Sequence, residues 1–318
     1  MRVLVTGGAG FIGANTCRAL AAHPDIERVI ALDDLSTGCE ANLAEVDAEL
    51  VVGSILDRPL LTEVVSTVDA VVHLAALPSV PRSLADPVGN HEANATGTLY
   101  VLEACRQAGT YIVAASSSSV YGSVAALPKH EDLPTRPMSP YAASKLATES
   151  YTLAYRTSFG VPALALRFFN VYGPYQSAGH AYAAVIPAFV EAALRGEPLP
   201  VYGDGKQSRD FTFVGTVAQV LVEAVTRRVV SDTPVNLAYG NRDTLLTLIE
   251  KLRPLVEEPI EVRHLPPRVG DVRESQADHT RLRALFPRIQ PEPLEAGLAQ
   301  TVAWYRDRYQ APQVTAVV

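Results

Sequence analysis

The chain has 318 residues, enough for one large domain or two smaller ones with a substantial core. Apolar residues make up 48% of it and charged residues 19%, a balance that is typical of a globular protein and excludes a disordered one. The net charge is −7 and basic residues cluster only in pairs, so neither nucleic acid nor an anionic membrane surface is an expected partner.

The three cysteines, Cys17, Cys39 and Cys105, are widely spaced and form no C-x-x-C pair. They predict reduced thiols, with no disulfide framework and no metal site. The first residues lead directly into an apolar run without the pattern of a signal peptide, and no later run approaches the length of a membrane span. We therefore expect a cytoplasmic protein.

Short apolar runs alternate with amphipathic segments through the first half of the chain. We predict strands at 2–6, 28–32, 48–53, 70–76, 111–116 and 163–169, and helices at 11–22, 91–107 and 140–158. Strands that are apolar almost throughout are typical of a sheet covered on both faces. The alternation predicts an α/β fold with a doubly wound parallel sheet.

The alternation ends near residue 169, where Pro and Gly become more frequent. We predict further helices at 183–195, 214–227, 244–256 and 292–308. This second half indicates a smaller α+β region whose segments interleave with the sheet. The predicted division assigns 1–168 with about 210–240 to the sheet domain, and 169–209 with 241–318 to the second region.

A glycine-rich turn lies between the first strand and the first helix. Gly7, Gly8, Gly10 and Gly13 satisfy the pattern G-x-G-x-x-G, which permits a tight turn and the close approach of a pyrophosphate to the start of the helix. Asp33 closes the second strand 20 positions after Gly13, where an acidic residue of a dinucleotide site is expected. The pattern predicts a bound dinucleotide.

The acidic residue indicates which dinucleotide is bound. A carboxylate at Asp33 accepts hydrogen bonds from a ribose 2′-hydroxyl and repels a 2′-phosphate, and residues 34–38 contain no Arg to pair with such a phosphate. We therefore expect NAD rather than NADP, with Asp34 as the alternative to Asp33.

A Tyr and a Lys share one face of the predicted helix at 140–158. Ser139 is placed to cap the helix and Gly160 to end it. Tyr141 and Lys145 are four residues apart, and an ammonium group beside a phenol lowers the pKa of the phenol. The serine run 116–119 ends a predicted strand, at the sheet edge where such folds bind their ligands.

Seven stretches occur in order along nearly the whole chain: "TGGAGFIG" (6–13), "HLAA" (73–76), "SSSSVYG" (116–122), "YAASK" (141–145), "RFFNVYGP" (167–174), "VYGDGKQSRDF" (201–211) and "PRVGDVRESQAD" (267–278). As a set they resemble the extended short-chain dehydrogenase/reductase family, and within it the nucleotide-sugar epimerases and dehydratases. The resemblance implies a Rossmann-type sheet domain that binds NAD and a second region that binds the nucleotide sugar. It also implies that Ser117, Tyr141 and Lys145 are catalytic.

The resemblance assigns further contacts by position. Those with the cofactor are Gly7, Gly10, Phe11, Ile12, Gly13, Asp33, Asp34, Ser54, Ile55, Leu74, Ala75 and Ala76, with Tyr141 and Lys145. Those with the substrate are Asn94, Ser117, Asn170, Gln176, Ala184, Tyr202, Arg209, Arg268, Asp271 and Ser275.

Several of the substrate positions have a definite implied role. Arg209 and Arg268 match ligands of the diphosphate. Tyr202 is placed to stack on uracil, and Asp271 to orient Arg268 or meet the nucleotide ribose. For Tyr202 and Asp271, a packed aromatic ring and a surface charge are the open alternatives.

The two residues after Ser117 bear on the reaction. In the related 4,6-dehydratases these positions resemble Asp-Glu, because elimination of water needs a further acid and base. Here they are Ser118 and Ser119, which do not act as a carboxylate acid or base at neutral pH. We therefore expect an NAD-dependent 4-epimerase. A dehydratase or a 4-keto-sugar reductase of the same family is the alternative, and a non-catalytic NAD-binding protein ranks last.

The expected sugar substrates and the expected oligomeric state also come from the family resemblance. Ser275 stands where galactose-restricted members carry a bulky Tyr, and Gln176 and Ala184 match epimerases that act on N-acetylhexosamines, as does the segment 79–83. We expect UDP-GlcNAc/UDP-GalNAc and UDP-Glc/UDP-Gal as substrates, and a homodimer joined by the helices at 91–107 and 140–158.

Overall fold

The protein is described by a computed structural model that covers residues 1–178, 184–267 and 273–310. Its main sheet has seven strands in the order β11-β6-β5-β4-β1-β2-β3, and every neighbouring pair is parallel. The strands are β1 (Arg2–Thr6), β2 (Arg28–Asp33), β3 (Glu49–Val52), β4 (Ala70–His73), β5 (Tyr111–Ser117), β6 (Ala163–Phe168) and β11 (Val235–Leu237). The predicted doubly wound parallel sheet is confirmed.

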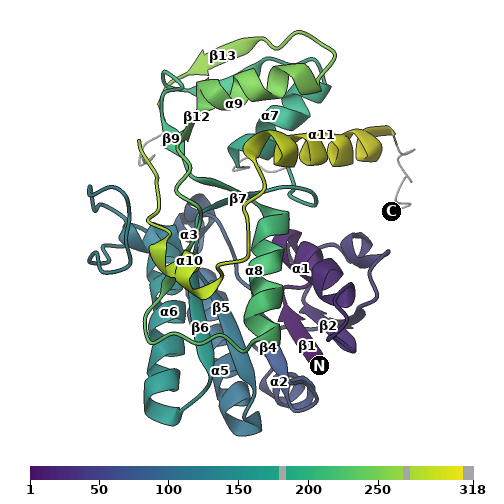
Figure 1. The fold of residues 1–318 in the computed structure, drawn as a ribbon, viewed down its shortest axis with the longest axis vertical. Coiled ribbons are helices and arrows are strands. Elements are labelled where there is room, and N and C mark those ends of the chain that lie inside the picture. Colours follow the sequence, from purple (N-terminus) through teal and green to yellow (C-terminus); the bar gives the residue numbers. More distant parts are fainter. Residues whose placement is uncertain (179–183, 268–272, 311–318) are drawn as a thin grey trace.

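Helices cover both faces of this sheet (Figure 1). They are α1 (Phe11–Ala21) and α8 (Val214–Thr226) on one face, and α2 (Arg58–Val65), α5 (Gly97–Ala108) and α6 (Pro140–Phe159) on the other. Val3 and Val5 of the central strand pack into the first core, whereas Leu4 between them packs into the second. The continuous apolar character of the strands follows from this burial on two sides.

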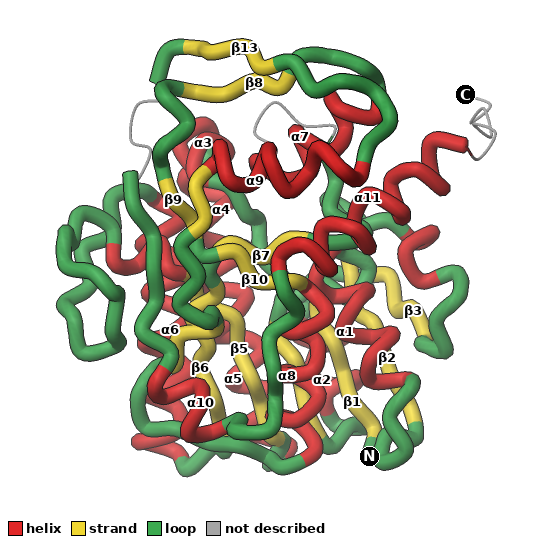
Figure 2. The backbone as a smooth tube through the Cα atoms, turned by 45° about the horizontal axis from the view of Figure 1, so that its top comes forward, coloured by secondary structure: helices red, strands yellow, loops and turns green. Residues whose placement is uncertain are grey.

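A smaller α+β part lies beyond the carboxyl ends of the strands (Figures 1 and 2). Three two-stranded sheets pair β10 with β7, β12 with β9 and β13 with β8. The strands are β7 (Asn170–Tyr172), β8 (Leu199–Tyr202), β9 (Ser208–Arg209), β10 (Phe211–Phe213), β12 (Asp243–Thr244) and β13 (Val262–Leu265), and the helices are α7 (Val185–Leu194), α9 (Leu245–Leu252) and α11 (Leu294–Gln310). Their apolar faces form a separate core that includes Phe189, Phe211 and Leu248.

The chain crosses between the two parts more than once. After β10 the chain returns to the main sheet and forms α8 and β11. It returns to this sheet a second time at the short helix α10 (Thr280–Leu285). Leu282, Phe286 and Ile289 belong to the core of the main sheet, so this portion of the range 241–318 packs with the sheet and not with the upper part. The domain boundaries themselves stay a prediction.

Several elements differ from the predicted ones. The helix expected at 91–107 is preceded by α4 (Pro87–His91) and a π-helical turn η2 (Glu92–Thr96), and α3 (Val80–Ala85) lies just before them. Helix α2 was not predicted, although Asp57 caps it by accepting a hydrogen bond from the Leu60 amide at 3.1 Å. Short 3-10 turns complete the fold: η1 (Glu40–Leu43), η3 (Ser118–Tyr121) and η4 (Arg253–Leu255). Within the described residues, no helix has the length and apolarity needed to cross a membrane.

The docking of α10 on the main sheet can be tested with two leucines. Leu282→Ala should lower the free energy of unfolding by about 2–5 kcal/mol, because it opens a cavity in the sheet core, where Leu282 is 1% exposed. Leu246→Ala is the control: this leucine is 39% exposed, and its loss should cost less than about 1 kcal/mol. Denaturant unfolding measures both, and equal costs for the two variants would contradict the docking.

Candidate active site

The structure brings Ser117 and Tyr141 together. Ser117 is the last residue of β5, and its Oγ accepts a hydrogen bond from the Ser119 amide at 3.1 Å, which turns the chain into η3. Tyr141 lies in the first turn of α6, which begins as predicted, with the Ser139 hydroxyl accepting a hydrogen bond from the Ala142 amide and Pro140 at the first position. The Ser117 hydroxyl lies near the Tyr141 phenol and lowers its pKa.

Lys145 lies one helical turn after Tyr141 and is buried. Its Nζ donates a hydrogen bond to the carbonyl oxygen of Ala115 in β5, at 2.9 Å. Burial lowers the pKa of Lys145 from 10.5 to about 8, because a low-dielectric surrounding disfavours the ammonium form. Through this bond the ammonium group joins α6 to the strand that carries Ser117.

The pKa of Tyr141 moves in the direction opposite to the expected one. Burial raises it, and the nearby Ser117 hydroxyl lowers it by a smaller amount. The expected lowering by Lys145 is not seen in this structure, where the ammonium is bonded to Ala115. Ser117 is therefore the group that favours the phenolate here.

The glycine turn is packed too closely for other residues. A Cβ on Gly13 would lie 2.0 Å from the carbonyl oxygen of Gly7, and a Cβ on Gly7 would lie 2.8 Å from the Ala75 amide. Gly7 also has a φ of +69°, a conformation that glycine adopts without strain. The turn, the start of α1 and residues 74–76 after β4 thus form one close-packed surface, and Gly10 begins α1 without a side-chain cap. Such a surface suits the pyrophosphate of a dinucleotide.

Asp33 is held beside this turn. Its carboxylate accepts hydrogen bonds from the amides of Ala9 and Leu35, both at 2.9 Å, and burial raises its pKa. Asp34 is exposed and accepts hydrogen bonds from the Ser36 amide and hydroxyl. The geometry thus favours Asp33 over Asp34 as the residue that meets an adenosine ribose.

The other expected cofactor contacts lie near the same sheet edge. Phe11 and Ile12 are partly buried against the core of the upper part, whereas Ile55 is buried in the second sheet core. Ser54 Oγ accepts a hydrogen bond from the Leu56 amide at 3.2 Å. Leu74, Ala75 and Ala76 follow β4 and are partly buried.

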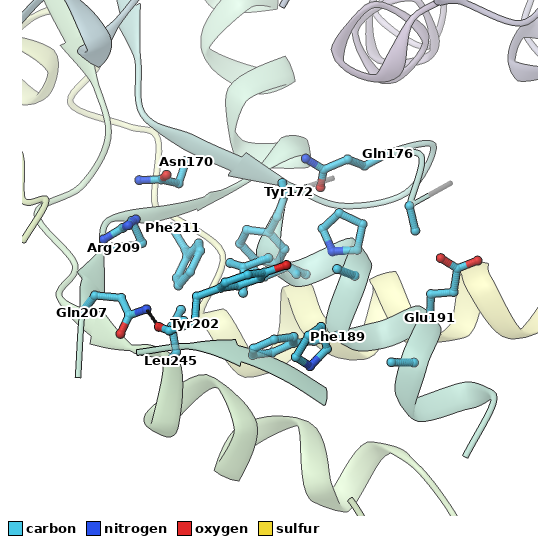
Figure 3. Close-up of a pocket in the computed structure, with 18 of the residues that line it drawn as sticks. Asn170, Tyr172, Gln176, Phe189, Glu191, Tyr202, Gln207, Arg209, Phe211 and Leu245 are labelled. Atoms are coloured by element: carbon cyan, nitrogen blue, oxygen red, sulfur yellow. Dashed lines mark hydrogen bonds between the residues drawn. The ribbon is translucent and has the colours of Figure 1, made fainter. Parts of the chain in front are cut away.

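A cavity of about 730 Å³ separates the upper part from the catalytic helix. Tyr141 and Ser79 line it from the sheet side. Five of the expected substrate residues line it from the upper part, as Figure 3 shows in part: Asn170, Gln176, Ala184, Tyr202 and Arg209. The phenol expected to act as a base therefore opens into the space that the expected substrate ligands surround.

Three predicted substrate residues in the described part of the chain do not line this cavity: Asn94, Ser117 and Ser275. Asn94 is 1% exposed; its side chain accepts a hydrogen bond from the Leu77 amide at 2.7 Å and donates to Ser144 Oγ at 3.0 Å. These bonds hold α6 against the segment after β4, and a contact of Asn94 with the substrate stays a prediction. Ser275 is partly buried and its amide donates to the carbonyl oxygen of Ser208. Arg268 and Asp271 lie outside the described residues.

Several residues that line the cavity were not predicted from the sequence. They are Phe189, Glu191, Gln207, Phe211, Leu245 and Arg263. Gln207 and Phe211 lie within the quoted stretch 201–211, and the Gln207 side chain donates to the carbonyl oxygen of Tyr202 at 2.7 Å. That stretch is the only feature of the sequence that indicated Gln207 and Phe211. Among the described residues, no cluster of His, Cys, Asp and Glu could hold a metal ion.

The lowered pKa of Lys145 has a measurable consequence for stability. Between pH 8 and 10.5 the unfolded chain binds a proton at Lys145 that the folded chain does not, so the stability of the wild type should rise with pH relative to Lys145→Met. At about 1.4 kcal/mol per pKa unit, the relative gain is about 3 kcal/mol at most. Denaturant unfolding without nucleotide, from pH 7 to 10.5, measures it, with Lys206→Met at an exposed lysine as control. If the difference in the free energy of unfolding between the wild type and Lys145→Met does not change with pH, the burial of the Lys145 ammonium is contradicted.

Comparison with known proteins agrees with this geometry. Residues 3–238 match the model of the NAD dependent epimerase/dehydratase family. The chain is 38% identical over 317 residues to a UDP-glucose 4-epimerase of Mycolicibacterium smegmatis (98% of this chain, 100% of the relative), and 35% identical over 315 residues to a dTDP-glucose 4,6-dehydratase of Mycobacterium tuberculosis (96% and 94%). A solved structure of UDP-N-acetylglucosamine 4-epimerase from Methanobrevibacter ruminantium, in complex with UDP-N-acetylmuramic acid, superposes with a TM-score of 0.91 at 35% identity (96% and 98%). The chain belongs to the NAD dependent epimerase/dehydratase family.

Proposed function

We propose that this protein is an NAD-dependent nucleotide-sugar 4-epimerase. One observation carries the proposal: the Tyr141 phenol, which lies near Ser117, opens into a cavity whose far side presents Arg209 and Tyr202. A base beside the sheet edge and a cation with an aromatic ring opposite it suit a substrate that has a reacting sugar at one end and a nucleoside diphosphate at the other.

The residues present fit NAD. The close-packed glycine turn and the uncapped start of α1 would hold the pyrophosphate, and Asp33 would accept hydrogen bonds from the hydroxyls of the adenosine ribose. Lys145 would bind the second ribose. When bound, NAD supplies the acceptor for the hydride that leaves C4 of the sugar and the donor that returns it to the opposite face.

The chain's own groups move the proton. Tyr141, as phenolate, removes the proton from the sugar O4 as the C4–H bond breaks, and a 4-keto sugar results. In the second half of the reaction the Tyr141 hydroxyl returns this proton to O4. Ser117, which lies near Tyr141, would hold O4. Lys145, with a pKa of about 8, is mostly protonated at neutral pH, so its positive charge is available to the bound state.

Epimerisation is favoured over dehydration by the turn that follows Ser117. Elimination of water needs an acid and a base beyond Tyr141, and η3 offers the hydroxyls of Ser118 and Ser119 at the positions where dehydratases resemble Asp-Glu. The 4-epimerase relatives support this choice, and the dehydratase at 35% identity keeps dehydration as the second candidate.

Gln176 supports the acceptance of N-acetylated sugars. Its Nε2 donates to the carbonyl oxygen of Val171 at 3.3 Å, whereas its Oε1 is buried and has no hydrogen-bond donor among the described residues. A buried amide oxygen without a donor is unfavourable by about 1–3 kcal/mol; Gln176 lines the cavity, so an acetamido N–H that reached this oxygen from there would satisfy it. We therefore propose UDP-GlcNAc/UDP-GalNAc as substrates beside UDP-Glc/UDP-Gal.

The homodimer and the cytoplasmic location stay predictions. On α6, the side chains of Tyr151 and Phe159 are exposed, and a second copy packed against this helix would cover apolar surface of this kind.

Tyr141→Phe tests the mechanism directly. Without the phenol hydroxyl no group can take the O4 proton, and kcat for interconversion of UDP-Glc and UDP-Gal should fall by about 10²–10⁴-fold. Tyr151→Phe removes a hydroxyl from an exposed position of the same helix and is the matched control. Chromatography of the product sugars measures both. Activity of Tyr141→Phe close to that of the wild type would contradict the mechanism, a product lighter by one water would identify a dehydratase, and stoichiometric consumption of reduced NAD would identify a reductase.

Gln176→Leu tests the sugar preference. The variant keeps the volume but removes the oxygen, so kcat/KM for UDP-GlcNAc should fall by about 5- to 100-fold while that for UDP-Glc changes by less than about threefold. The same chromatographic assay with both sugars measures the ratio. If the wild type converts UDP-Glc but does not turn over UDP-GlcNAc, the N-acetyl part of the proposal is wrong.

A further inference from the structure

A buried ion pair lies behind the candidate catalytic residues. Glu149 follows Lys145 by one turn of α6, and Arg167 lies in β6 beside the strand that ends at Ser117. The guanidinium Nε and Nη2 donate to the two carboxylate oxygens of Glu149 at 2.8 and 2.7 Å. The side chains are 3% and 5% exposed, so the pair is almost completely removed from solvent.

The carboxylate of this pair contacts the residue before Ser117. The Ser116 hydroxyl donates to Glu149 Oε2 at 3.0 Å and lies 3.3 Å from the carbonyl oxygen of Lys145. Ser116 is therefore fixed to the helix that carries Tyr141, at the level of Lys145. Because Ser116 and Ser117 are consecutive in β5, this contact sets how far the Ser117 side chain stands from that helix.

The guanidinium of the pair contacts the turn after Ser117. Arg167 Cζ lies 4.7 Å from the centre of the Tyr121 ring, and Tyr121 is the last residue of η3. The Tyr121 hydroxyl in turn donates to Asn236 Oδ1 in β11 at 2.7 Å. The residues on both sides of Ser117 are thus held by the two halves of one ion pair.

Stability alone does not account for such a pair. Removing two charges from water costs several kcal/mol, and replacing a buried pair with apolar side chains of similar volume is often neutral or stabilising. What apolar side chains do not reproduce is direction: two parallel hydrogen bonds and a third from Ser116 fix β5, β6 and α6 relative to one another.

We propose that the Glu149–Arg167 pair is a positioning element that holds the Ser117 side chain in place near the Tyr141 phenol. This inference rests on the proposed function for its kinetic consequence. Neither Glu149 nor Arg167 lines the cavity, so both act through Ser117 and not on the substrate.

The test replaces both charges at once. Glu149→Met with Arg167→Met leaves no unpaired buried charge and should fold, with a melting temperature within about 5 °C of that of the wild type. Its kcat should fall by about 10- to 100-fold while KM for the UDP-sugar changes by less than about twofold, because the Ser117 hydroxyl, which the two substitutions displace, acts on the reacting atoms. Arg28→Met with Glu49→Met removes an exposed ion pair between β2 and β3 and is the matched control, with unchanged kcat.

A thermodynamic cycle separates positioning from support of the fold. If the pair acts through Ser117, adding Ser117→Ala to the double methionine variant should lower kcat by less than about threefold further, whereas independent effects would multiply. Leu61→Ala, at a buried leucine of α2, provides a variant with reduced stability and an intact site, and its kcat at a temperature where it is folded should equal that of the wild type.

Two further measurements make the outcome decisive. Ser116→Ala removes only the hydrogen bond between Ser116 and Glu149, and the ion pair of Glu149 with Arg167 remains. This variant should lower kcat by about 3- to 10-fold, and it tests the proposal even if the double methionine variant does not fold. Hydrogen exchange of the backbone over residues 116–122 should be faster in both variants than in the wild type. Unchanged exchange together with kcat within about twofold in Ser116→Ala and in the double variant would overturn the proposal. If the wild type is inactive on every nucleotide sugar, the proposed function is wrong. The hydrogen-exchange result would still decide whether the Glu149–Arg167 pair positions Ser117.

Discussion

The candidate site depends on the parallel pairing of β5 with its two neighbours. Because β4, β5 and β6 run in the same direction, their carboxyl ends meet at one edge, where the polar residues His73 and Ser117 end β4 and β5. Ser117 ends β5, and the segment after β4 carries Ala75, which packs on Gly7. A strand reversed at this point would separate the serine from the glycine turn, so the topology itself assembles the cofactor surface next to the reacting hydroxyls.

Buried polar side chains then join β1 and β4 to α5. His73 Nδ1 lies 2.8 Å from Thr6 Oγ1, and its Nε2 lies 2.9 Å from Thr98 Oγ1. Since the Thr98 hydroxyl donates its proton to the Asn94 carbonyl oxygen, it accepts from Nε2–H, and Nδ1 accepts from Thr6. Burial and the charge of Lys145 lower the pKa of His73 to about 3, which keeps this directional chain intact at neutral pH.

The features that depend on local pattern could be predicted from the sequence, and those that depend on packing could not. Tyr141 and Lys145 were found from their spacing on one helix, and the sheet from its apolar runs. A polar residue in a matching stretch does not reveal which groups its side chain contacts; Asn94, in the π-helical turn η2, bonds with Leu77 and Ser144, which no local pattern indicated. The cavity residue Arg263 comes from β13, and no spacing along the chain relates it to the catalytic helix.

Burial acts on the two ionisable groups of the site in opposite directions. It raises the pKa of Tyr141 and lowers that of Lys145, so desolvation alone favours a neutral phenol beside a less strongly charged amine. A phenolate base therefore needs specific contacts that outweigh desolvation, and in this structure the Ser117 hydroxyl provides the one that favours it. Such a contact is effective only at hydrogen-bonding distance, which is why residues outside the cavity, such as Glu149 and Arg167, bear on a proton transfer that takes place inside it.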